Sequence, residues 1–571
     1  MDFLEKIHSL AETSDRMPYT PQQMFFRTAA GLLFCFSGGV LYAASLPPFN
    51  LSLLAAVCLL PLLGFMRRAD LKKAALGGWI WGLGWSLFSF RFLREIDPAV
   101  PWLIAPVLSL WPAFFAMSVS TLTRNTLKKD GMLPAKEQPF AVILLISTGT
   151  AAFFVLTEWT RSRLFTWNDF SVPFWRIPAM LQISTLTGHY GVNFTVALCN
   201  TALAALLFYR SRKVFAVLFA VIIAVYGYGF LKLHCRPEQK TLRFSPALIQ
   251  GNLSQRRHAS MEQVKEALDV YVSTTAELLE KSKPEIVIWP ESAIPIPFYS
   301  AHDLSRYYQS SDYGRFARSY QLMVKGLCRR YSTPMLIGAL DLEDSLDGKG
   351  GGATNSALLF DSSGSLKAKY DKLHRVPFGE YIPFRRLLPE FILQRIDMGR
   401  DLVPGRNANP VVLSPDIRSG TAICYEGVFS YVMRNFAKRG ANVFIVLSND
   451  AWYPRSSEPE QHLANAVLRA VETGLPMIRC GNNGGSGMVY PDGTFRIIDP
   501  TGKHPRPELL RCKAAEVISV DVPLKPEQTF YVRYGEWFIL LLILQVLFWA
   551  KTAAGNFLAD RKRTADLLEK E

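Results

Sequence analysis

The sequence predicts a protein in two parts: an α-helical membrane bundle of eight transmembrane helices, and an α/β domain inserted before the eighth. Long apolar runs follow one another through the first 232 residues. A polar block of alternating short β-branched runs and longer helical patterns then fills residues 233–534. The composition agrees, since 49% hydrophobic and 19% charged residues are too apolar for an ordinary soluble enzyme. The net charge of +15 does not indicate nucleic-acid binding, because the basic residues gather beside the apolar runs.

Seven apolar runs precede the polar block, and an eighth follows it. Most are close to the ~20 residues that a helix needs to cross the hydrocarbon core of a bilayer, although the second and the eighth are short. The runs are 28–44, 51–66, 75–93, 102–122, 139–158, 190–208, 214–232 and 536–550. With a cytoplasmic N-terminus, the inside loops before the polar block carry eleven Lys and Arg residues and the outside loops five, which obeys the positive-inside rule.

These runs divide the chain into five predicted segments. They are a cytoplasmic N-terminal extension (1–26), a seven-helix transmembrane region (27–232), a polar domain (233–534), an eighth transmembrane helix (535–551) and a cytoplasmic tail (552–571). An even number of crossings returns both ends of the chain to the cytoplasm. The polar domain then lies on the outer side of the membrane.

The outside loop 159–190 is rich in aromatic residues, and two interpretations stay open. It carries Trp159, Phe165, Trp167, Phe170, Phe174 and Trp175. Aromatic residues often form a belt at the membrane interface. The alternative is a re-entrant or lid segment that shapes an entry path for lipid.

The polar block reads as an α/β domain with a layered sheet. The predicted strands are 242–249, 285–289, 334–340, 355–361, 419–424, 443–448, 477–480 and 487–490. The predicted helices are 261–282, 314–330, 428–438 and 459–473. Between them, the stretch 373–409 is long and rich in Pro and Gly, which is typical of a functional or mobile loop.

A single cysteine ends one of the predicted strands. The apolar run from Ser419 leads to Cys424, Glu426 follows two residues later, and Gly427 then breaks the strand. A thiol at a strand end with small residues around it is accessible to a substrate. Alone, however, this pattern favours a buried, inert cysteine, because that is how most cysteines behave.

Two other stretches make a catalytic Cys424 the better interpretation. In one, a buried strand ends at Pro290 and Glu291 follows, which places a possible general base at a strand end. In the other, Lys372 precedes a Pro-Phe-Gly-Glu segment that ends at Glu380. Lys372 could stabilise an oxyanion, and Glu380 could orient or neutralise the lysine. The alternative is that the carboxylates are solvated loop residues and that the charged run around Lys372 is a solvated face.

The remaining polar signals are weaker. His462 and Arg469 lie at helical spacing, with Glu458 and Glu460 near the start of the same predicted helix. This pattern favours acidic residues at a helix N-terminus and a surface histidine over a catalytic Cys–His pair. The eight cysteines form no CxxC pair, and no nucleotide-binding or zinc motif occurs, so we expect no cofactor and no metal.

Together the three stretches resemble the nitrilase superfamily, whose members carry Glu, Lys and Cys in this chain order at strand ends of an αββα sandwich. The matching segments are Trp289–Glu291, Tyr370–Lys372, Ile423–Glu426 and Leu447–Trp452. With a membrane region around it, the whole chain resembles the apolipoprotein N-acyltransferases. Gln250–Asn252 also matches the start of that family's domain.

The resemblance implies an activity and a location. The activity is transfer of a fatty acyl chain from a phospholipid, through a cysteine thioester, to the N-terminal amine of a diacylglyceryl apolipoprotein. Glu291, Lys372 and Cys424 would be the catalytic residues, with Glu380, Tyr425 and Glu426 in support. The location is the bacterial inner membrane, with the catalytic domain on the periplasmic side.

Two rival functions follow from the same residues. A membrane-tethered amidase or other nitrilase-type hydrolase would use the same triad with water as the acceptor, but eight spans are far more anchor than a soluble substrate requires. A transporter or receptor would carry ionisable groups within its spans. The apolar runs are nearly free of them, which disfavours this second rival.

Overall fold

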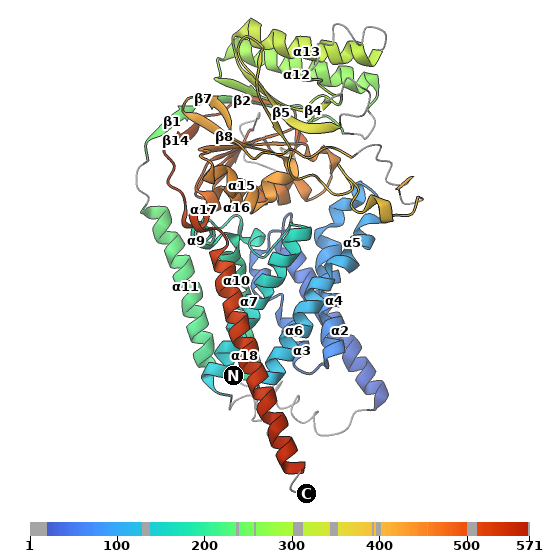
Figure 1. Cartoon of the computed structure of the whole chain (residues 1–571), viewed down its shortest axis with the longest axis vertical. Coiled ribbons are helices and arrows are strands. Elements are labelled where there is room, and N and C mark those ends of the chain that lie inside the picture. Colours follow the sequence, from blue (N-terminus) through green and yellow to red (C-terminus); the bar gives the residue numbers. More distant parts are fainter. Residues whose placement is uncertain are drawn as a thin grey trace.

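A computed structural model of the chain describes residues 20–127, 138–235, 239–255, 259–300, 312–342, 352–390, 393–394, 401–453, 455–499 and 511–568. Most of the predicted N-terminal extension therefore lies outside the described residues. The membrane-type helices form one bundle, and the α/β domain is stacked on one end of it (Figure 1). Helix α2 begins, and helix α18 ends, at the opposite end of the bundle (Figure 1).

Six helical segments of the described chain are long and apolar enough to cross a membrane, rather than the eight predicted. They are Gln22–Ser45 in α2 (Pro21–Ser45), Val100–Thr126, which comprises α5 (Val100–Leu108) and α6 (Leu110–Thr126), α7 (Phe140–Leu164), α10 (His189–Tyr209), α11 (Arg212–His234) and Trp537–Ala559 in α18 (Trp537–Leu568). These helices make the chain a multi-pass membrane protein. The predicted cytoplasmic tail is largely a continuation of α18.

The other two predicted spans have shorter or less apolar counterparts. Run 51–66 forms a 3₁₀ turn (η1, Ser52–Ala56) followed by the short helix α3 (Leu60–Met66). Run 75–93 lies mostly in α4 (Leu71–Ser89), which is 19 residues long and begins with Lys72 and Lys73. Helix α4 packs closely on α2, because a Cβ at Gly39 would lie 2.0 Å from the carbonyl oxygen of Trp81.

The aromatic segment after α7 is compactly folded and mostly buried. It folds into the short elements η4 (Val172–Phe174), α8 (Pro178–Leu181) and α9 (Ser184–Thr187). Trp167, Phe170, Phe174 and Trp175 are buried where the bundle meets the α/β domain. Arg161, which falls within the predicted loop 159–190, is a buried residue of α7 that pairs with Glu158 at 2.7 Å.

The α/β domain is an αββα sandwich, as the resemblance implies. In its described part, one six-stranded sheet has the order β13-β2-β3-β4-β5-β6 and the other the order β12-β11-β10-β9-β8-β7. The strands of the first are β13 (Ala514–Val517), β2 (Pro246–Gln250), β3 (Ile286–Ile288), β4 (Met335–Leu342), β5 (Ala353–Phe360) and β6 (Leu366–Asp371). Those of the second are β12 (Phe495–Ile497), β11 (Gly487–Val489), β10 (Met477–Gly481), β9 (Val443–Ser448), β8 (Ile417–Ile423) and β7 (Val411–Ser414). A separate antiparallel pair joins β1 (Thr241–Phe244) to β14 (Val520–Pro523).

Side-chain alternation builds the layers of the sandwich. In β3, Ile286 and Ile288 belong to the core shared by the two sheets, whereas Val287 packs in a second core beneath the outer helices. Helices α12 (Met261–Lys281) and α13 (Asp312–Tyr331) cover this outer face (Figure 1). Helices α15 (Ser430–Lys438) and α16 (Glu458–Thr473) lie between the second sheet and the membrane bundle (Figure 1).

Helix α16 is the main contact between the two parts of the protein. Every residue in it except Glu460 is buried. Its Gln461 accepts hydrogen bonds from Trp167 Nε1 at 2.8 Å and Asn168 Nδ2 at 2.9 Å, and donates to the carbonyl oxygen of Pro47 at 3.1 Å. The polar face of α16 therefore forms hydrogen bonds with the bundle rather than with solvent.

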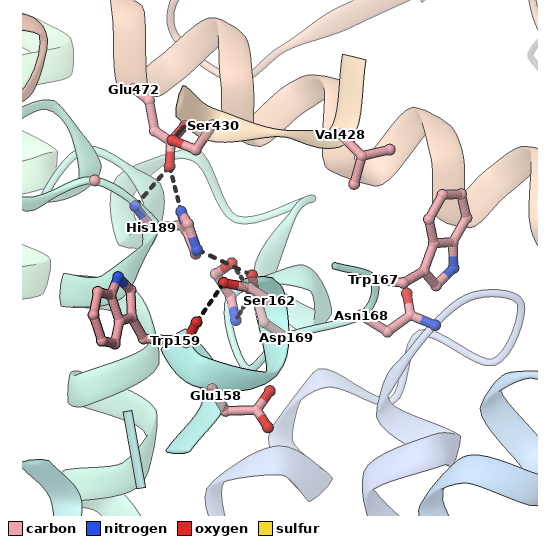
Figure 2. A network of polar contacts seen from close by, with 12 residues as sticks. Glu158, Trp159, Ser162, Trp167, Asn168, Asp169, His189, Val428, Ser430 and Glu472 are labelled. Atoms are coloured by element: carbon pink, nitrogen blue, oxygen red, sulfur yellow. Dashed lines mark hydrogen bonds and ion pairs between the residues drawn. The ribbon is translucent and has the colours of Figure 1, made fainter. Parts of the chain in front are cut away.

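A second polar network joins the other end of α16 to helix α10 (Figure 2). Glu472 accepts hydrogen bonds from the backbone N–H of His189 at 2.7 Å and from the hydroxyl of Ser430 at 2.7 Å, and its Oε1 lies 2.7 Å from His189 Nδ1. His189 Nε2 lies 3.3 Å from Asp169 Oδ2. One buried carboxylate thus connects α16, the start of α15 and the first residue of a membrane helix.

Candidate active site

The structure brings the three predicted catalytic residues together at strand ends from both sheets. Glu291 comes soon after β3 and Lys372 directly after β6, both in the first sheet, while Cys424 directly follows β8 in the second. Lys372 Nζ lies 3.2 Å from Glu291 Oε1. The charges of Glu291 and Lys372 both act on the Cys424 thiol, with opposite effects on its pKa.

Cys424 stands at a sharp change of backbone direction. It begins the 3₁₀ turn η6 (Cys424–Val428) with a φ of 52°, in the left-handed region that costs a non-glycine residue about 1 kcal/mol or more. Burial, followed by the nearby Glu291 charge, raises the pKa of the Cys424 thiol well above its ordinary value, although Lys372 acts against this. The resting residue is therefore a thiol that needs a base to become a nucleophile.

Lys372 is held between two carboxylates. Its Nζ lies 2.8 Å from Glu380 Oε1, in addition to the contact with Glu291. Burial alone would lower the pKa of Lys372, but Glu291 and Glu380 raise it well above its ordinary value. The Asn355 side-chain amide donates to Glu291 at 2.7 Å and to Glu380 at 2.8 Å, so one cation and one amide hold both carboxylates.

Glu426 connects the cysteine turn to the lysine segment. Its carboxylate accepts hydrogen bonds from the backbone N–H groups of Leu373 at 2.7 Å, His374 at 2.9 Å and Ile423 at 3.0 Å, and from the Tyr370 hydroxyl at 3.0 Å. Burial raises its pKa to about 7, while the backbone N–H groups act to lower it. This geometry fits a role for Glu426 in supporting the cysteine turn.

Tyr425 faces the membrane bundle. Its hydroxyl donates to the carbonyl oxygen of Thr166 at 3.1 Å, and its ring lies 6.0 Å from that of Trp167. Burial raises the pKa of the phenol above its ordinary value, so the group stays neutral and serves as a hydrogen-bond donor. The residue that follows Cys424 therefore contacts the aromatic segment after α7.

His462 is buried, which corrects its predicted surface position. It is 1% exposed, its Nδ1 lies 3.0 Å from Asp450 Oδ1, and its Nε2 lies 3.2 Å from the carbonyl oxygen of Cys424. Potential ligand atoms of Cys424, Asp450 and His462 lie within 4.8 Å of one another, a spacing at which a metal ion could be held. Both ring nitrogens face oxygens, however, and the nitrogen that donates to the Cys424 carbonyl has no lone pair for a metal.

Two family models match the chain. The apolipoprotein N-acyltransferase N-terminal domain matches residues 38–202, and the carbon-nitrogen hydrolase model matches residues 247–525. An apolipoprotein N-acyltransferase from Geobacter metallireducens is 29% identical over 515 residues, which cover 88% of this chain and 91% of the relative. Another, from Brucella suis, is 28% identical over 560 residues, or 93% of this chain and 96% of the relative. The chain belongs to the apolipoprotein N-acyltransferase family.

The two family matches follow the architecture of this acyltransferase. The N-terminal match runs from α2 to α10, and the hydrolase match from β2 to just beyond β14. Among solved structures, a cysteine-to-alanine variant of an amidase from Nesterenkonia is 18% identical and covers 54% of this chain and 98% of its own, with a TM-score of 0.34.

Sequence reasoning missed three polar residues at this acyltransferase site. Asn355 stands on β5, where its sequence signal is only a polar residue inside an apolar strand. Asp450 follows β9 within a segment that was recognised without assigning it a role, and His462 was assigned to the surface. Their contacts cross from one sheet or helix to another, which local sequence patterns do not report. All eight cysteines are free in the structure.

Proposed function

We propose that the protein transfers a fatty acyl chain from a phospholipid to the N-terminal amine of a diacylglyceryl apolipoprotein, through a thioester on Cys424. The observation that carries the proposal is the buried Glu291–Lys372 ion pair, whose charges both act on the Cys424 thiol, in a domain mounted on the membrane bundle through α16. The names and full-length similarity of the relatives support the same substrate class.

Formation of the thioester requires a base and an oxyanion site. Glu291 takes the thiol proton, and Cys424 Sγ attacks the ester carbonyl of the phospholipid. Lys372, which the two carboxylates keep charged, and the backbone N–H of Tyr425 stabilise the tetrahedral oxyanion. The carbon–oxygen ester bond then breaks, Glu291 returns its proton to the departing lysophospholipid, and the acyl group remains on Cys424.

The second half-reaction consumes the thioester. The neutral α-amine of the diacylglyceryl cysteine attacks the thioester carbonyl, and Glu291 accepts a proton from the nitrogen. The carbon–sulfur bond breaks as the amide forms, and the proton passes to the cysteine sulfur. Because lysophospholipid leaves before the amine binds, the kinetics are ping-pong. Glu380 holds Lys372, and Glu426 holds the turn that carries Cys424.

The membrane arrangement suits two lipid-bearing substrates. We infer that α4 and the short segment Ser52–Met66 complete eight crossings, which agrees with α2 beginning and α18 ending at the same end of the bundle (Figure 1). The loop charges then orient the α/β domain toward the periplasm, with both ends of the chain in the cytoplasm. The two domain boundaries, near residues 233 and 534, follow from this topology. Both acyl-bearing substrates would reach Cys424 without leaving the bilayer.

Intact-mass analysis of the full-length protein tests the proposal. After incubation with a phospholipid of one acyl composition, we expect the mass of one acyl group on Cys424 and none on Cys424→Ala. A diacylglyceryl peptide with a free α-amine should remove this group, and the matched N-acetylated peptide should not. Equally fast loss in buffer alone would identify a hydrolase, and acyl transfer by Cys424→Ala would refute the thioester.

A further inference from the structure

The backbone of Cys424 needs support that its own conformation does not supply. At a φ of 52° an L-residue is strained, and such strain persists only where the surroundings hold it. On its N-terminal side, Glu426 accepts the backbone N–H of Ile423 at 3.0 Å. At the strained residue, His462 Nε2 lies 3.2 Å from the carbonyl oxygen of Cys424. The nucleophile is thus held at two successive backbone positions.

Two oxygens hold the ring of His462 from opposite sides. A backbone carbonyl only accepts, so Nε2 carries a hydrogen toward Cys424. Nδ1 faces Asp450 Oδ1 at 3.0 Å, and Arg479 Nη2, from β10, lies 3.5 Å from the other oxygen of Asp450. The ring is thus fixed between the Cys424 carbonyl and the Asp450 carboxylate.

The other groups around the ring leave this pairing intact. Glu458, on the same helix, has Oε1 3.8 Å from His462 Nδ1, and burial raises its pKa well above its ordinary value, so it brings no second negative charge. The ring of Trp167, from the aromatic segment after α7, lies 5.8 Å from the imidazole ring. Helix α16, which carries His462, is itself fixed to the bundle through Gln461.

We propose that His462 is a positioning residue: it donates to the Cys424 carbonyl, holds the left-handed turn and so fixes the direction of the thiol, while Asp450 orients its ring. His462 touches the backbone of the nucleophile and no reacting atom. The position of the nucleophile is thereby linked to the helix that docks on the membrane bundle. Acylation of the thiol rests on the proposed function, whereas its positioning by His462 does not.

Substitutions of His462 by side chains of different length distinguish a positioning role from simple packing. In His462→Gln the side-chain amide nitrogen reaches about as far as Nε2 and can still donate to the Cys424 carbonyl. In His462→Asn the amide nitrogen falls short of this carbonyl. Asp450→Asn keeps the ring but removes the charge that orients it. His234→Asn, at an exposed histidine of α11, is the matched control.

Two rates are measured on each full-length variant in detergent, together with its melting temperature. One is alkylation of Cys424 by iodoacetamide, followed on the peptide that contains it, and the other is thioester formation from a saturating phospholipid. We expect both rates to fall about 10²-fold in His462→Asn, because a misplaced nucleophile loses this much. In His462→Gln they should stay within about tenfold of the wild-type rates, since the hydrogen bond is retained. Asp450→Asn should lie between the two, and the phospholipid KM should stay unchanged.

Equal losses in His462→Gln and His462→Asn, or a wild-type rate in His462→Asn, would overturn the proposal. If His462→Asn does not fold, the comparison rests on Asp450→Asn, which must then be slower than His462→Gln. If the wild-type protein forms no thioester, the proposed function fails. The alkylation rates would still decide whether His462 positions the thiol.

Discussion

Asn355 is the residue that lets two carboxylates share one lysine. Its amide donates to Glu291 at 2.7 Å and to Glu380 at 2.8 Å. In Asn355→Asp, three carboxylates would surround Lys372, and the mutual repulsion would disturb the Glu291–Lys372 pair. We expect thioester formation to fall about 10²-fold with little change in the phospholipid KM, which single-turnover kinetics can measure. Asn435→Asp, at an exposed position of α15, should have no effect; an unimpaired Asn355→Asp would contradict this role.

Glu426 should make stability depend on pH. Burial raises its pKa from 4.5 to about 7, so the folded state binds a proton more tightly than the unfolded state. Its contribution is complete below about pH 4.5 and is lost as the pH rises through 7, an effect of about 3 kcal/mol. In Glu426→Gln this part of the pH dependence should disappear. Thermal unfolding at pH 5 and pH 8 measures it, and an unchanged pH dependence in the variant would show that Glu426 does not titrate in this range.

At the scale of elements, Glu472 should be the most sensitive ionic contact of α16. It pairs with Arg469 at 2.8 Å and contacts His189 across the junction with the bundle (Figure 2). Although burial acts in the opposite direction, Arg469 and His189 lower its pKa below the ordinary value. Glu472→Gln would leave the buried Arg469 guanidinium without its charged partner, at a cost of about 3–5 kcal/mol. The wild-type protein keeps this stability at neutral pH and loses it as the pH falls through the lowered pKa.

Thermal unfolding of Glu472→Gln at pH 7 checks this prediction. Glu277→Gln, at an exposed position of α12, is the matched control and should melt like the wild-type protein. If the two variants melt at the same temperature, the network in Figure 2 contributes nothing measurable to stability.

Elements with strong apolar patterns could be predicted, and those whose form depends on neighbours could not. Helix α12 and strands β3, β9 and β10 begin and end within about two residues of the predicted ranges. Strand β6 was missed because it is a half-exposed edge strand with alternating lysines. Run 51–66 was apolar enough to suggest a span, but it folds as a 3₁₀ turn and a short helix against α2, α4 and α10.

For the molecule as a whole, sequence patterns located the candidate site but predicted neither how its strands assemble nor how deeply its residues are buried. Glu291 and Cys424 were identified at or just after predicted strand ends, whereas Lys372 was identified from the Pro-Phe-Gly-Glu segment that follows it. Their assembly followed from the resemblance. That β3 and β6 lie in one sheet and β8 in the other is a tertiary fact that no local pattern contains. For the same reason His462 was assigned to the surface, since the bundle covers a helix that would be half exposed in an isolated domain.

This coverage leads to a prediction about the separated domain. Without the bundle, α16 would lose the partners of Gln461 and the contacts of Glu472 with His189. We expect α16 amides in an excised 239–527 segment to exchange hydrogen at least about tenfold faster than in the full chain, because local opening costs less where fewer contacts are buried. Amides of α12, on the far side of the sandwich, should exchange equally in both and serve as the internal control (Figure 1). Equal protection of α16 in the two proteins would mean that the α/β domain holds its site alone. Faster exchange confined to α16 would mean that the membrane bundle stabilises the helix that contacts Cys424.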